Sequence, residues 1–239
     1  MTAEQWTRTV REQLRLGRLL PLGGVRDGAW ISEEAAGAVL RRAAEGMRDV
    51  RLGPVRIGHA DSEDAHDFAV PPPPSALAPG PLLVTAECAA TAAQPLPATA
   101  ERLRAVLAAA AEGLGLVVTE VDVRVTDLLD GDEEPEALPV RPPERSAAEP
   151  GRDPDAKLAA AAALTVPGVA HLTGVLGGAV HIEERRQQGA AALPRRHVRL
   201  ELAVRADHRA LDVAREVRVR VQQVLPDHPT VGVLVTTVR

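Results

Sequence analysis

Aromatic side chains are almost absent from this chain of 239 residues, which contains two tryptophans, one phenylalanine and no tyrosine. Its hydrophobic cores must therefore be built from alanine, valine and leucine, which pack in shallow layers. This composition argues against a large ligand pocket lined by aromatic rings. Lysine is nearly missing as well: Lys157 is the only lysine among 28 basic residues, a bias typical of a high-GC bacterial genome.

Cysteine occurs only once, at Cys88. A single cysteine excludes an intramolecular disulfide and a thiolate-rich zinc site, and it fits a reducing compartment. Cys88 falls on the inward side of a predicted strand, where a thiol acts as a small core hydrophobe. No signal peptide is evident either, because charged residues interrupt any apolar run in residues 1–20. We expect a cytoplasmic protein.

One charge-free segment, Leu158 to Ile182, is long enough to cross a bilayer of roughly 30 Å as a helix. Alanine and glycine dominate this segment, however, and Pro167-Gly168 interrupts it. We therefore expect a helix, a turn and a strand inside a buried, alanine-rich unit.

The same order of apolar patterns occurs twice, in residues 29–128 and 155–239. A helix-spaced set recurs after 114 positions, and alternating strands before and after it recur after 116 and 112 positions. The helix sets are Leu96, Ala100, Leu103, Leu107 and Ala110, and Ala210, Ala214, Val217, Val221 and Val224. The strand sets are Val84, Ala86, Cys88 and Ala90 with Leu200, Leu202, Val204 and Ala206, and Val121, Val123 and Val125 with Val233, Val235 and Thr237. This repetition indicates a tandem duplication.

Each copy predicts an α+β unit in the order helix, strand, strand, helix, strand, with the helices on one small sheet. The first helix covers Glu33 to Gly46 behind the N-cap Ser32, and its counterpart covers Asp155 to Thr165. A brief strand at 29–31 opens the first copy. The predicted organisation is an N-terminal helical extension (1–28), a first unit (29–128) with a disordered insertion (59–81), an acidic proline-rich linker (129–156) and a second unit (157–239).

The formal charge of −5 is unevenly distributed. The linker has a net charge of −6, the first unit without its insertion −2, and the second unit +5. Acidic residues, several prolines and few large apolar residues predict a disordered linker. Because the two units differ in surface charge, we expect them to face different partners.

Several short motifs carry a resemblance to a known family. The second unit has an alanine-rich helix, then Val166-Pro167-Gly168-Val169 and the glycine-rich run Thr173-Gly174-Val175-Leu176-Gly177-Gly178. The first unit has Trp30-Ile31-Ser32 before its helix, and Gly115-Leu116 before the valine-alternating strand that runs to Val125. In these features the chain resembles two tandem copies of the alkaline shock protein family, which are bacterial envelope stress response proteins.

The resemblance implies a non-catalytic envelope stress response or scaffold protein at the cytoplasmic face of the membrane. Its partner would be a membrane-anchored protein or a paralogue of the family, and a homo-oligomer is a further alternative. The resemblance carries over no catalytic residue and no cofactor.

The arginines of the second unit form a candidate surface for a partner or an anion. They are Arg185, Arg186, Arg195, Arg196, Arg209, Arg215, Arg218 and Arg220. Such a surface can meet anionic lipid, the acidic linker of its own chain, or nucleic acid phosphates. A nucleic-acid-binding module is therefore the alternative function, although this unit has no aromatic residue on which bases would stack.

Residues 2–20 place Trp6, Val10 and Leu14 on roughly one helical face. This helix can dock on a partner or a membrane surface, or pack back on the first unit.

The remaining candidates have simpler interpretations. The donors for a metal at 59–67 stand in a loop with nothing to fix them: His59, Asp61, Glu63, Asp64, His66 and Asp67. The glycines Gly174, Gly177 and Gly178 precede a strand rather than a helix, so they predict a turn and not a phosphate loop. No serine stands beside a base and an orienting group. We predict no catalytic, metal or cofactor site.

Overall fold

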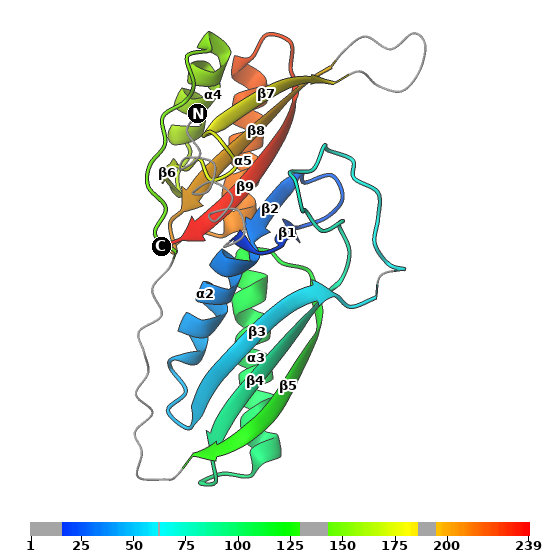
Figure 1. The fold of residues 1–239 in the computed structure, drawn as a ribbon, viewed down its shortest axis with the longest axis vertical. Coiled ribbons are helices and arrows are strands. Elements are labelled where there is room, and N and C mark those ends of the chain that lie inside the picture. Colours follow the sequence, from blue (N-terminus) through cyan, green and yellow to red (C-terminus); the bar gives the residue numbers. More distant parts are fainter. Residues whose placement is uncertain (1–15, 62, 130–142, 186–194) are drawn as a thin grey trace, which may run out of the picture.

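The computed structural model describes residues 16–61, 63–129, 143–185 and 195–239. These residues form a mixed α+β structure with four helices and two sheets (Figure 1). The helices are α2 (Glu33–Ala44), α3 (Leu96–Leu114), α4 (Pro154–Leu164) and α5 (Ala210–Val224). The strands are β1 (Leu19–Leu22), β2 (Ala29–Ser32), β3 (Val50–His59), β4 (Leu82–Thr91), β5 (Val118–Leu129), β6 (Val169–Leu172), β7 (Val180–Arg185), β8 (Arg195–Val204) and β9 (Thr230–Val238).

The smaller sheet has the strand order β3-β4-β5. β3 pairs antiparallel with β4, and β4 pairs parallel with β5 through the crossover helix α3. The alternation predicted for β4 is confirmed, because Val84, Ala86, Cys88 and Ala90 are all buried. Cys88 is therefore a core residue, and burial raises the pKa of its thiol.

The larger sheet has the order β1-β2-β9-β8-β6, and β7 also pairs with β8. β8 and β9 are parallel strands joined by α5, whereas β7 is antiparallel to β8. β2 pairs parallel with β9, so that Ile31 lies beside Val235. The first strands of the described chain and its last strand therefore belong to one sheet.

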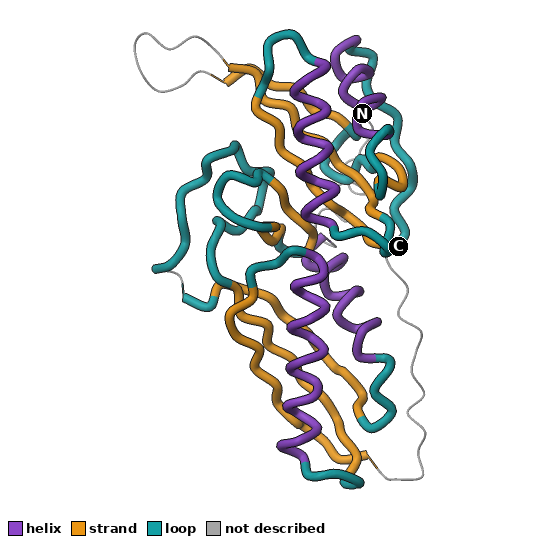
Figure 2. The backbone as a smooth tube through the Cα atoms, turned by 180° about the vertical axis from the view of Figure 1, so that it is seen from behind, coloured by secondary structure: helices purple, strands orange, loops and turns teal. Residues whose placement is uncertain are grey.

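Both long crossover helices lie on the same side of the molecule, behind the strands in Figure 1 and in front of them in Figure 2. Their inward residues, such as Leu107 of α3 and Val217 of α5, belong to a single core cluster that includes both sheets. Leu211 of α5 packs against Gly115, the left-handed C-cap of α3, where an added Cβ would lie 2.4 Å from the Leu211 Cβ. The two halves of the chain thus share one hydrophobic core.

Loops cover the other face of the larger sheet. Trp30 of β2 and Leu234 of β9 pack there with Leu16, Val70 and Val175 in a second buried cluster. The corresponding face of the smaller sheet carries no described helix or strand and points toward the viewer in Figure 1. The two sheets therefore differ in what covers this face.

Part of the segment at 59–81, which the sequence predicts to be a disordered insertion, packs on β1 instead, and His59 ends β3. Val70 is only 7% exposed, and the Leu77 amide donates to the Leu19 carbonyl over 2.8 Å. A few large apolar side chains in a segment rich in proline and alanine are enough to bury it against the sheet.

The predicted N-terminal helical extension is described only from residue 16 onward. There Leu19–Leu22 form β1, so Leu19 and Leu20 lie in a strand and not in a helix. All four residues of β1 are buried because the two clusters cover opposite faces, and a strand buried on both faces shows no alternation.

Other predicted elements are confirmed. Ser32 caps α2 by accepting a hydrogen bond from the Ala35 amide over 3.2 Å. The charge-free segment from Leu158 is the helix α4, a turn and the strands β6 and β7, and none of the described helices is long and apolar enough to cross a bilayer. The predicted disordered linker (129–156) is not confirmed: residues 130–142 lie outside the described residues, but the Ala148 amide donates to the Leu172 carbonyl over 2.9 Å and α4 begins at Pro154.

We predict that Gly115→Ala destabilises the protein by about 3 kcal/mol, because it forces an L-residue to φ 95° and drives a Cβ into Leu211. The matched control is Gly113→Ala in the same helix, where an added Cβ meets nothing within 4 Å. This control should stabilise the protein by up to about 1 kcal/mol. If chemical denaturation gives the same change in the free energy of unfolding for both variants, Gly115 does not pack against Leu211 in a shared core.

Candidate functional site

The arginines on α5 bind groups of their own chain. Arg215 holds both carboxylate oxygens of Asp27 at 2.8 and 3.0 Å. Arg218 donates to the carbonyls of Val231 (2.8 Å) and Arg26 (2.9 Å), and Arg209 donates to the Glu112 carbonyl (3.3 Å). These contacts tie α5 to the turn before β2 and to the end of α3.

The contact with Arg215 also lowers the pKa of Asp27. Burial alone would raise the pKa of Asp27, but hydrogen bonds from Arg215 and from the Gly24 amide outweigh it and hold the pKa below its usual value. The carboxylate therefore stays ionised and keeps its arginine partner.

The other arginines of the candidate surface lie away from this contact. Arg196 pairs with Asp155 at 2.7 Å and Asp227 at 3.3 Å, and Arg220 pairs with Glu216 at 2.7 Å. Arg195 is exposed at the start of β8, and Arg185 ends β7. Arg186 lies outside the described residues, as do Trp6, Val10 and Leu14 of the predicted docking helix.

A buried acid, Glu201 in β8, lies beneath the loop between β6 and β7. Its neighbours Leu200 and Leu202 face the helices, so Glu201 faces the loop-covered side of the sheet. The carboxylate accepts hydrogen bonds from the backbone amides of Val175 (2.6 Å) and Leu176 (3.1 Å), while the side chain is wholly inaccessible to solvent. Burial raises the pKa of Glu201 to about 7 against the opposing effect of these amides and of Arg199.

The backbone of Glu201 holds the same loop. Thr173 donates its amide to the Glu201 carbonyl over 2.9 Å, and the Glu201 amide donates to the Ala179 carbonyl over 3.0 Å. The hydroxyls of Thr173 and Thr236 are 2.8 Å apart, which joins the loop to β9. Sequence reasoning missed this network because Glu201 looks like any polar residue in an alternating strand.

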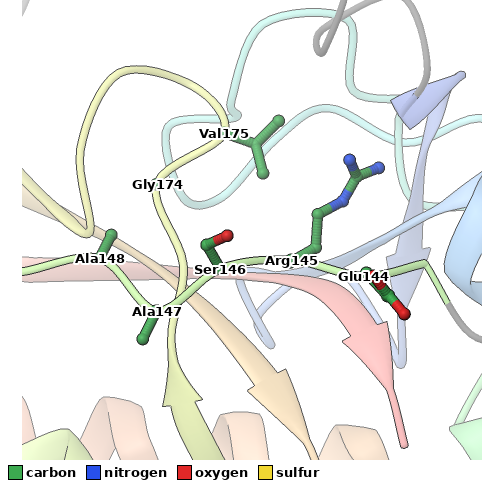
Figure 3. A pocket seen from close by; sticks show the side chains of 7 residues that line it. All are labelled: Glu144, Arg145, Ser146, Ala147, Ala148, Gly174 and Val175. Atoms are coloured by element: carbon green, nitrogen blue, oxygen red, sulfur yellow. The ribbon is translucent and has the colours of Figure 1, made fainter.

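A cavity of about 310 Å³ lies beside this loop (Figure 3). Its walls are the extended segment 144–148 together with Gly174 and Val175. Figure 3 shows Arg145 and Ser146 projecting toward the side on which Val175 lies. The Arg145 guanidinium already pairs with Glu34, and Glu144 also belongs to the lining, so the cavity presents no unbalanced positive charge.

The remaining predicted candidates are placed as follows. The His59 ring is hydrogen-bonded to the Ala78 carbonyl over 2.8 Å, and no group of three or more potential metal donors comes together within the described ranges. Gly177 has φ 106° in the turn between β6 and β7, as expected of a turn glycine.

No protein-family model matches the chain, and no curated protein matches it either.

We predict that Glu201 makes the protein less stable as the pH rises. Its folded pKa of about 7 exceeds the ordinary value of 4.5, so its stabilising contribution is complete below pH 4.5 and is lost as the pH rises through 7. This loss amounts to about 3 kcal/mol. In chemical denaturation over this pH range, Glu201→Gln should remove the decline.

The control for this experiment is Glu101→Gln, whose side chain is 85% exposed. This variant should keep the pH dependence of the wild-type chain. If the free energy of unfolding of Glu201→Gln declines with pH as steeply as that of the wild-type chain, the decline does not come from Glu201.

Proposed function

We propose that the chain is a duplicated, non-catalytic scaffold of the alkaline shock type, which acts through protein contacts at the cytoplasmic face of the membrane. The proposal rests on the sequence resemblance and on one observation about strand pairing. The proposed scaffold consists of two such units in tandem.

The supporting observation is that corresponding residues pair in the two sheets. Val84 pairs with Val121, and Leu200 pairs with Val233. The first members of these pairs are 116 positions apart and the second members 112, the displacements found in the sequence. The next inward pair, Ala86 with Val123, corresponds in the same way to Leu202 with Val235.

The connections support duplication too. An antiparallel pair precedes a parallel crossover in β3-β4-α3-β5, and the same order recurs in β7-β8-α5-β9. Each last strand contains a register shift near its end, beyond Val125 in β5 and beyond Val235 in β9. Under the displacement of 112 these shifts lie two positions apart, so the support for duplication comes from the shared order of strand pairing.

The arginine contacts do not favour the nucleic-acid alternative. Arg209, Arg215 and Arg218 bind groups of the same chain, so fewer cationic donors remain for phosphates. In a salt titration, the affinity of the chain for nucleic acid should therefore not fall steeply as the salt concentration rises.

We expect the chain to enter the membrane fraction of its native cells under envelope stress, and to cross-link there to an integral membrane protein. Purified chain mixed with anionic or neutral vesicles is the control, and it should not sediment with either. Sedimentation with anionic vesicles alone would instead indicate direct lipid binding, which salt weakens. A chain that stays in the soluble fraction without a membrane-protein cross-link would contradict the proposal.

A further inference from the structure

The strand β5 has an open edge. It pairs with β4 over its whole length, and no described helix or strand lies on its other side in Figure 1. An edge of 12 residues leaves a row of backbone donors and acceptors ready to pair with another strand.

The corresponding edge of β9 is occupied. There β2 pairs with β9, and Val233 and Val235 are completely buried. Of their counterparts in β5, Val121 is only partly buried and Val123 is 8% exposed. The smaller sheet therefore lacks a strand at the place where the larger sheet has one.

The sequence of β5 is nearly palindromic about Val123. In an antiparallel pair of two β5 strands centred on this residue, Asp122 of each copy lies opposite Arg124 of the other. Val121 then lies opposite Val125, and Val118 lies opposite Leu128. Apolar residues meet apolar residues and opposite charges meet, which are the pairs that stabilise sheets.

Other registers match less well. A pair centred on Asp122 places two Asp122 carboxylates opposite each other, and one centred on Arg124 does the same with two guanidiniums. A shift by a single residue would place charged side chains opposite the valines of the helix-covered face.

The charges at the centre of the edge are available for such a contact. Within the part of the chain that the structure describes, neither Asp122 nor Arg124 forms an ion pair, and both are exposed. Leu128, at the end of the strand, is 59% exposed although it is a large apolar residue. The proposed register covers it with Val118 of the other copy.

From these observations we propose that two copies of this chain associate by antiparallel pairing of their β5 edges about Val123. The pairing joins two three-stranded sheets into one continuous six-stranded sheet across a two-fold axis. This proposal does not rest on the partner named under the proposed function.

The first test is the mass of the full chain in solution, measured by sedimentation velocity with its dependence on concentration. The wild-type chain should be a dimer. Asp122→Arg and Arg124→Asp each place like charges opposite one another twice, so each should raise the dissociation constant at least about tenfold. The double variant Asp122→Arg/Arg124→Asp restores opposite charges and should recover the dimer.

The second test locates the axis by disulfide formation in a Cys88→Ala background. Directly opposite residues have Cβ atoms about 5 Å apart, so Val123→Cys should form a disulfide-linked dimer. Thr126→Cys in the same strand is the control, because its copies would lie about 20 Å apart and should not cross-link.

A monomeric wild-type chain would overturn the proposal. So would a dimer that the double variant fails to restore, or one that cross-links at residue 126 as readily as at 123. Far-UV circular dichroism checks that each variant remains folded.

Discussion

The parallel pairing of β2 with β9 is the constraint on which the rest of the structure depends. It places residues 29–31 beside residues 233–235, and the Val233 amide donates to the Gly28 carbonyl over 2.9 Å. Because these are backbone contacts between distant parts of the chain, the larger sheet is complete only when both ends of the chain have folded onto it. α2 follows β2 directly and runs from the larger sheet toward the smaller one (Figure 1).

The polar contacts reinforce this connection. Asp27 lies two residues before β2, and Arg215 on α5 binds its carboxylate at the surface. On the opposite face, Trp30 of β2 lies in the cluster that also contains Val175, whose amide is held by Glu201. Three arginines of the predicted cationic surface, Arg209, Arg215 and Arg218, therefore connect the two halves of the folded chain.

Local periodicity predicted the regular elements well, and it identified Cys88 as a core residue because each element repeats its inward positions. It did not predict where β2 pairs, since a buried strand of four residues has no alternation and its partner lies about 200 positions away. The role of Glu201 was equally hidden, because its hydrogen bonds come from a loop whose position depends on the tertiary fold. The packing of Val70 on β1 was missed because the prolines and acids around it suggested a solvated segment.

The central claim is that the two halves form one folded unit through β2 and the shared core. Its most direct test is a specific protease site placed within residues 130–142, followed by cleavage of the full chain and size-exclusion chromatography. The two fragments should elute together in native buffer at the volume of the uncut chain and separate only in denaturant. Two separately eluting, folded fragments in native buffer would contradict the claim.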